Sequence, residues 1–108
     1  MKTSGYGNVI YGHFVKGPIP LGWLERCAGL GFSHLKIGLA IWYLVGMSGS
    51  HTVRLTTTAR RKLLVSPRWL SKSLKEMKEA GLIRIERMGL GRVPEVTLTV
   101  DEYYRDAY

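Results

Sequence analysis

VRLTTTARRKLLVSPRWLSKSLKEMKEAGLIRIERMGLGRVPEVTLTV, residues 53–100, is the stretch that decides the fold of this 108-residue chain. It opens with a short predicted strand at 53–56, and a first helix follows. A second helix is predicted at 67–80, after which apolar and polar residues alternate at 82–87 and at 95–100. The pattern predicts a strand, two helices joined by a tight turn, and a β-hairpin.

The second of these helices has clear start and stop signals. Ser66 offers a side-chain cap, and Pro67 fits the first turn because its missing N–H is not needed there. Gly81 is the residue expected just beyond the C-terminus of the helix. Helical spacing places three apolar residues on one inward face, namely Leu70, Leu74 and Met77.

The opposite face of this helix is basic. At about 100° per residue, Arg68, Lys72 and Lys75 lie away from the apolar positions, with Ser71 beside them. Trp69 lies at the flank of the helix. For Trp69 we expect packing against the hairpin or the first helix rather than stacking on a ligand.

The remaining segments surround this unit. Residues 1–17 are interpreted as an N-terminal arm and residues 101–108 as a tail. Helices are predicted at 20–31 and at 33–47, the latter with Ser33 as its N-cap.

These two helices differ in pattern. Leu21, Leu24 and then Cys27 or Ala28 follow helical spacing in the first, so they are expected to face inward. The helix at 33–47 is apolar on nearly every side and must be buried on two sides. One side is expected on the core of 53–100, and the other on the preceding helix, a second subunit, or both.

The net charge is concentrated in the same stretch. Residues 54–92 hold eleven basic and three acidic residues, which accounts for the whole formal charge of +8, while the rest of the chain is neutral. A generic solubilising surface would scatter its charges. The concentration favours a polyanionic partner.

Other classes of function find little support. A single cysteine, Cys27, excludes an internal disulfide and has no metal-ligand spacing with the histidines, which we interpret as surface or capping residues. No apolar run approaches the roughly 20 residues of a membrane span, and no signal peptide is recognised, so a cytoplasmic protein is expected. Paired carboxylates and phosphate-binding glycine motifs are lacking, so we predict neither an enzyme nor a cofactor.

The predicted fold class is mainly α with a small β-wing, a winged helix-turn-helix forming one domain over 1–108, with its core at 33–100. Residues 63–87, LLVSPRWLSKSLKEMKEAGLIRIER, resemble the recognition segment of bacterial winged helix regulators such as the MarR-like group. In that group a serine opens the recognition helix and a Gly-Leu-Ile step leads into the wing. The 108 residues depart from that group in length, so we do not expect the long C-terminal dimerisation helices of these regulators.

The resemblance implies double-stranded DNA as the partner, with helix 67–80 in the major groove and the wing at 88–94 on the backbone or in the minor groove. Arg68 is placed where a guanidinium contacts either guanine or a phosphate. The recognition-helix candidates are Pro67, Arg68, Trp69, Ser71, Lys72 and Lys75. The backbone candidates are Thr56, Thr57, Thr58, Arg60, Arg61, Lys62 and Lys78, and the wing candidates are Arg87 and Arg92.

The predicted function is therefore transcription regulation by sequence-specific DNA binding. A homodimer is expected through the N-terminal arm and the helices at 20–31 and 33–47. One alternative is a phage- or plasmid-borne winged helix that binds a protein or nucleoprotein machine. Another is a plasmid replication or partition factor with the same DNA-binding chemistry.

Overall fold

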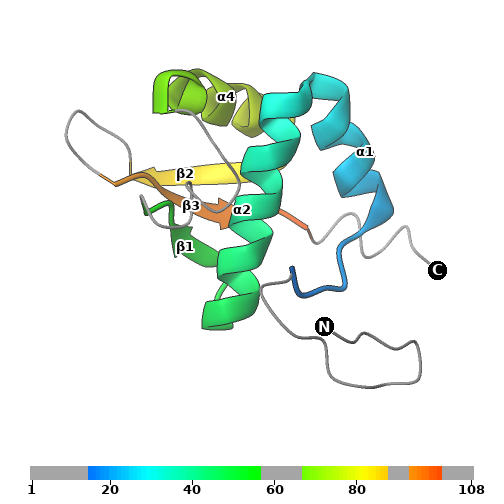
Figure 1. Cartoon of the computed structure of the whole chain (residues 1–108), viewed down its shortest axis with the longest axis vertical. Coiled ribbons are helices and arrows are strands. Elements are labelled where there is room, and N and C mark those ends of the chain that lie inside the picture. The colour runs from blue at the N-terminus through cyan, green and yellow to red at the C-terminus, as the bar shows by residue number, and fades with distance from the viewer. Residues whose placement is uncertain (1–14, 57–66, 88–92, 101–108) are drawn as a thin grey trace, which may run out of the picture.

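The structure is a computed structural model that describes residues 15–56, 67–87 and 93–100 (Figure 1). These residues form three helices and a three-stranded antiparallel sheet, so the described part of the chain is a mixed α and β fold. The helices are α1 (Leu21–Leu30), α2 (Phe32–Ser48) and α4 (Pro67–Glu79). The strands are β1 (Thr52–Arg54), β2 (Ile83–Arg87) and β3 (Glu95–Leu98).

The last strand of the chain is the central strand of the sheet. The order is β1-β3-β2, and β3 pairs antiparallel with both neighbours. Val96 lies opposite Val53 on one side and Ile85 on the other, so one face of the sheet carries an apolar row. Alternation along the strands then leaves the other face polar.

The apolar face of the sheet and the three helices enclose one core. Buried residues of α1, α2 and α4 join those of the strands in a single cluster. At its centre the rings of Trp23 and Trp42 meet edge to face, with centroids 5.7 Å apart. The predicted inward face of α4 is confirmed, because Leu70, Leu74 and Met77 are all buried.

Helix α1 confirms the prediction at 20–31 within one residue at each end, but the inward face differs. Trp23 and Cys27 are fully buried, whereas Leu21 is 71% exposed. Gly38 of α2 explains the difference, because a Cβ atom there would lie 2.8 Å from the Cys27 sulfur and 3.0 Å from the Trp23 ring. The two helices therefore pack closely at this glycine. Trp23 belongs to the core and is not available for the predicted dimer surface.

Helix α2 extends one residue further than predicted at each end. Its N-cap is Gly31, so the prediction that Ser33 caps the helix is wrong. Gly49 follows the last residue in the left-handed conformation, and its N–H donates to the Val45 carbonyl at 2.8 Å. As expected for a helix that is apolar on most sides, α2 packs on α1 along one side and on α4 and β1 along others.

Strand β1 is shifted relative to the predicted strand at 53–56. It runs from Thr52 to Arg54, and Leu55 follows as a buried residue outside the strand. The Leu55 N–H donates to the Pro94 carbonyl at 2.9 Å, so the segment after β1 still contacts the segment before β3.

Helix α4 ends as the sequence predicts. Gly81 adopts a positive φ of 79°, and its N–H donates to the Lys78 carbonyl while the Leu82 N–H donates to the Met77 carbonyl. This pair of hydrogen bonds is the Schellman arrangement, which closes a helix and redirects the chain. Strand β2 begins immediately afterwards at Ile83.

Candidate nucleic-acid interface

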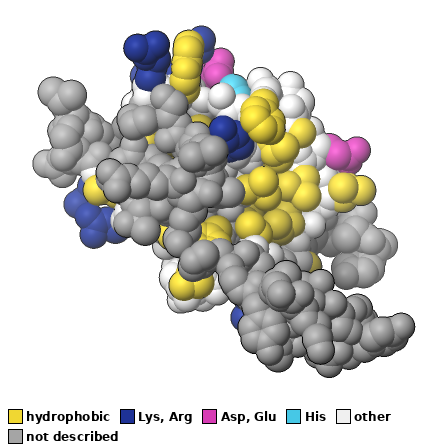
Figure 2. Space-filling view, in the orientation of Figure 1, with side chains coloured by type: hydrophobic (Ala, Val, Ile, Leu, Met, Phe, Trp, Pro, Cys, Tyr) yellow, Lys and Arg dark blue, Asp and Glu magenta, His cyan; other side chains and the backbone are white. Residues whose placement is uncertain are grey.

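The candidate site is the exposed face of α4. Arg68, Lys72 and Lys75 are exposed, as is Ser71 beside them. The predicted separation of a cationic face from the buried apolar face is therefore confirmed. Figure 2 shows Lys and Arg side chains at the top of the view, where α4 lies. The C-terminal end of α4 carries two further exposed charged residues, the cation Lys78 and the carboxylate Glu79.

Trp69 lies at the edge of this face, and its side chain is 49% exposed. The first helix of the predicted pair lies outside the described residues, so packing of Trp69 against it stays a prediction. The Nζ atom of Lys72, three residues further along, lies 5.9 Å from the ring centroid. A half-exposed indole beside an ammonium group offers an apolar surface and a positive charge together. This is a combination that suits the sugar and phosphate of a nucleic-acid backbone.

Three long-range contacts fix the position of α4. His34 of α2 places its Nε2 atom 2.7 Å from Oε1 of Glu76, in the last turn of α4. From α1, Arg26 donates to the Ala80 carbonyl at 2.9 Å, and the Trp23 indole donates to the Leu82 carbonyl at 3.1 Å. Because carbonyls at a helix C-terminus carry partial negative charge, the guanidinium is well placed there. The cationic face is thus presented by a helix that is held by contacts at its C-terminal end.

His34 therefore corrects the prediction that each histidine is a surface or capping residue. Its side chain is 13% exposed, and its partner Glu76 is 42 positions away in the sequence. No local spacing pattern reports such a pair. The one sequence signal is that Glu76 lies between Lys75 and Lys78 on a helix whose cations outnumber its two glutamates.

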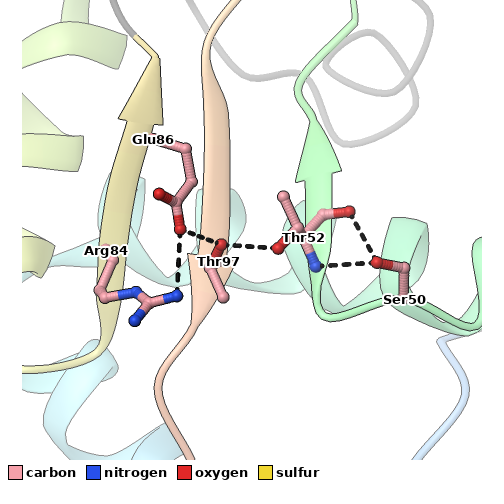
Figure 3. Close-up of polar contacts among 5 residues, drawn as sticks. All are labelled: Ser50, Thr52, Arg84, Glu86 and Thr97. Atoms are coloured by element: carbon pink, nitrogen blue, oxygen red, sulfur yellow. Dashed lines mark hydrogen bonds and ion pairs between the residues drawn. The ribbon is translucent and has the colours of Figure 1, made fainter.

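The polar face of the sheet carries a row of hydrogen bonds that the sequence did not indicate (Figure 3). The Thr97 hydroxyl donates to Oε2 of Glu86 at 2.6 Å, and the Thr52 and Thr97 hydroxyl oxygens are 2.7 Å apart. A hydroxyl group can donate only one hydrogen bond, and that of Thr97 is directed to Glu86. The Thr52 hydroxyl is therefore the donor in the hydrogen bond to Thr97. Arg84 adds a contact of 3.2 Å to the same carboxylate. The row joins all three strands.

The charge state of Glu86 follows from these contacts. The hydrogen bond from Thr97, together with the nearby positive charge of Arg84, holds the pKa of the Glu86 carboxyl below its ordinary value of 4.5. The register of β2 against β3 shifts between Ile85 and Arg87, so Glu86 is the extra residue of a bulge. Arg84 and Glu86 are two positions apart in β2, so strand alternation places them on the same face.

Some of the other predicted site residues lie in the described part of the chain, and the rest lie outside it. Thr56 is exposed just after β1, Arg87 is exposed at the end of β2, and Pro67 is the first residue of α4. The remaining candidates lie outside the described residues, and these are Thr57, Thr58, Arg60, Arg61, Lys62 and Arg92. The predicted N-terminal arm up to residue 14, the loop 88–92 and the tail 101–108 also lie outside them.

The described residues contain neither a metal-binding cluster nor a reactive cysteine. No group of three His, Cys, Asp or Glu side chains there is arranged to hold a metal ion. Cys27 is fully buried, its thiol donates to the His34 carbonyl at 3.1 Å, and burial raises its pKa to about 11. A buried, protonated thiol is a poor nucleophile. No helix among these residues is long and apolar enough to cross a membrane.

Comparison of the chain with protein-family models, curated proteins and solved structures gives no match.

Proposed function

We propose that this protein binds double-stranded DNA through the exposed face of α4, as a winged helix-turn-helix. In this proposal α4 is the recognition helix, and the β2–β3 hairpin is the wing. The observation that carries the proposal is the division of α4 into two faces. Leu70, Leu74 and Met77 are buried in the core, whereas Arg68, Lys72 and Lys75 are exposed on the opposite face.

Each cation has a proposed role. Arg68 lies in the first turn of α4, the part of a recognition helix that reaches deepest into the major groove, where a guanidinium contacts guanine O6 and N7 or a phosphate. Lys72 and Lys75 suit phosphates, because an ammonium group is a compact charge without the planar fork of arginine. Arg87, at the end of β2, would contact the adjacent backbone.

The process served by this binding is proposed to be transcription regulation, without catalysis and without a cofactor. The concentration of the chain's excess charge in residues 54–92 supports a DNA partner over a protein partner. A protein-binding winged helix would not require cations on the face that its recognition helix presents.

A binding titration tests the proposal. Anisotropy of a labelled random duplex is measured at fixed salt with the native chain and with Arg68→Ala, Lys72→Ala and Lys75→Ala. We expect each single variant to lose affinity, by about tenfold for Arg68→Ala. The same result with a single strand of equal length would redirect the proposal to single-stranded nucleic acid.

Lys16→Ala is the matched control. Lys16 is an exposed cation whose Cβ lies against Gly46, so the alanine keeps the local packing and removes one charge. Gly46 is twelve residues from His34 along α2, about 18 Å from the contact with α4. The control is expected to bind like the native chain. An equal loss in the control and the α4 variants would indicate a general charge effect and would contradict the proposed site.

A further inference from the structure

One long face of helix α2 carries apolar residues that do not belong to the buried core of the described residues. We call it the α2 stripe, and its residues are Phe32, Leu35, Leu39, Tyr43 and Met47. They are spaced by three or four positions, so they lie along one side of the helix. Phe32 is 74% exposed and Met47 71% exposed, and the three residues between them are half-buried.

The stripe continues an apolar surface of the molecule. In Figure 2 hydrophobic side chains gather over the region of α2 and α1. Beside the end of the stripe lies a cleft of about 390 Å³. Its apolar lining is Leu44 and Met47 of α2 and Val53 of β1, and Ser48, Thr52, Arg54 and Glu95 complete its wall. Exposed apolar surface of this kind is characteristic of a surface that binds another protein.

Charge argues that the partner is a second copy of this chain. The chain carries a formal charge of +8, and two copies repel each other wherever their basic segments meet. Along α2 the only charged residue is Lys36, and the excess charge of the chain lies in residues 54–92. The α2 stripe is thus a surface on which two copies can meet with little repulsion.

The ends of α2 fix the direction of such a pair. The helix has no acidic residue in its first turn and no basic residue in its last turn, so neither end of its dipole is compensated by its own side chains. An antiparallel pair places the positive end of each helix beside the negative end of the other. A parallel pair would instead place like ends and the two Lys36 side chains together.

We propose that two copies of this chain pair antiparallel through their α2 stripes, around a two-fold axis near Leu39. This axis brings Phe32 of one copy to Met47 of the other. It also brings Lys36, whose Nζ now lies 5.2 Å from the Phe32 ring, toward the last turn of the partner's α2. The proposal stands independently of DNA binding, because α4 contributes none of these residues.

Substitutions that introduce opposite charges at the two ends of the α2 stripe test both the pairing and its direction. The molar mass in solution is measured by light scattering at about 100 µM for the native chain, Phe32→Glu, Met47→Lys and the double variant. We expect twice the 12.2 kDa chain mass for the native protein and the chain mass for each single variant. The double variant should recover the dimer, because in an antiparallel pair each new glutamate faces the partner's new lysine.

Leu21→Glu is the matched control, since Leu21 of α1 is as exposed as Met47 but lies outside the stripe. It should leave the dimer intact, and circular dichroism should show every variant folded. A native chain of single mass, or a Phe32→Glu variant that stays dimeric, would overturn the proposal. Failure of the double variant to recover the dimer would overturn the antiparallel arrangement.

Discussion

His34 of α2 and Glu76 of α4 meet at 2.7 Å, so the helix that carries the cationic face is tied to the helix beneath it by one polar pair. Glu76 is 41% exposed at its side chain, which reduces the strength of the interaction. The pair nonetheless lies across an interface between two packed helices. The main effect of the His34–Glu76 contact is to fix the orientation of α4 relative to α2.

Removal of this pair should weaken the protein modestly. Glu76→Gln keeps the size of the side chain and removes its charge, and we expect a loss of about 1 kcal/mol in the free energy of unfolding measured in urea. Glu79→Gln, an exposed carboxylate one turn further along α4, is the control and should change the free energy by less than about 0.5 kcal/mol. Equal effects of the two substitutions would show that the contact with His34 contributes nothing.

The close approach of α1 and α2 predicts opposite effects for two glycine-to-alanine changes. Gly38→Ala places a Cβ 2.8 Å from the Cys27 sulfur and 3.0 Å from the Trp23 ring, and we expect it to destabilise the protein by about 1–3 kcal/mol. Gly29→Ala, in α1, meets nothing within 4 Å and should stabilise it by about 0.5–1 kcal/mol through helix propensity. Thermal unfolding of both variants checks the pair. A stabilising Gly38→Ala would contradict the packing described for these helices.

The Cys27 thiol should report on the opening of the core. Because it is fully buried and its pKa is raised to about 11, it should react with a thiol reagent in the folded protein at pH 8 far more slowly than in urea. Rapid modification of the folded protein would show that the thiol is accessible.

The raised pKa of Cys27 also predicts a pH dependence of stability. The thiol of the unfolded chain ionises near pH 9.0, whereas the folded thiol stays protonated up to about pH 11. The contribution of the thiol to the free energy of unfolding is therefore fully present below pH 9 and is lost as the pH rises toward 11. Cys27→Ala should remove this alkaline loss.

The polar row on the sheet predicts an acid-side effect. Since the folded Glu86 carboxyl has a pKa below 4.5, its contribution to stability is present above the pKa of the unfolded chain and is lost as the pH falls through the folded value. Thr97→Val keeps the shape of the side chain and removes the hydrogen bond. Urea unfolding between pH 6 and pH 3 should therefore show a smaller loss of stability in Thr97→Val than in the native chain. The same pH profile for both would exclude the Thr97 contact as the cause.

Periodic features of the fold could be predicted from the sequence, because they depend on neighbours in the chain. Leu70, Leu74 and Met77 follow helical spacing, and their burial and the exposure of Lys72 follow from the same geometry. The stop at Gly81 was predictable for the same local reason.

Features that depend on distant partners could not be predicted in this way. Helical spacing predicted that Leu21 and Cys27 of α1 both face inward. The burial of Cys27 and Trp23, and not of Leu21, depends on the close packing of α1 against Gly38 of α2. Ser33 is a good capping residue by type, yet α2 begins one residue earlier, after Gly31. The 42-position separation of His34 and Glu76 likewise leaves no trace in local composition.

The dependence of DNA binding on salt is the most direct test of the central claim, that the exposed face of α4 binds duplex DNA. About six phosphate contacts should give a slope near −5 in a plot of log K against log salt concentration. The triple variant of Arg68, Lys72 and Lys75 to alanine should flatten the slope by about 2.7 if all three contact phosphates, and Lys16→Ala should leave it unchanged. A native chain with no salt dependence, or a triple variant with the native slope, would contradict the assignment of α4 as the DNA-binding helix.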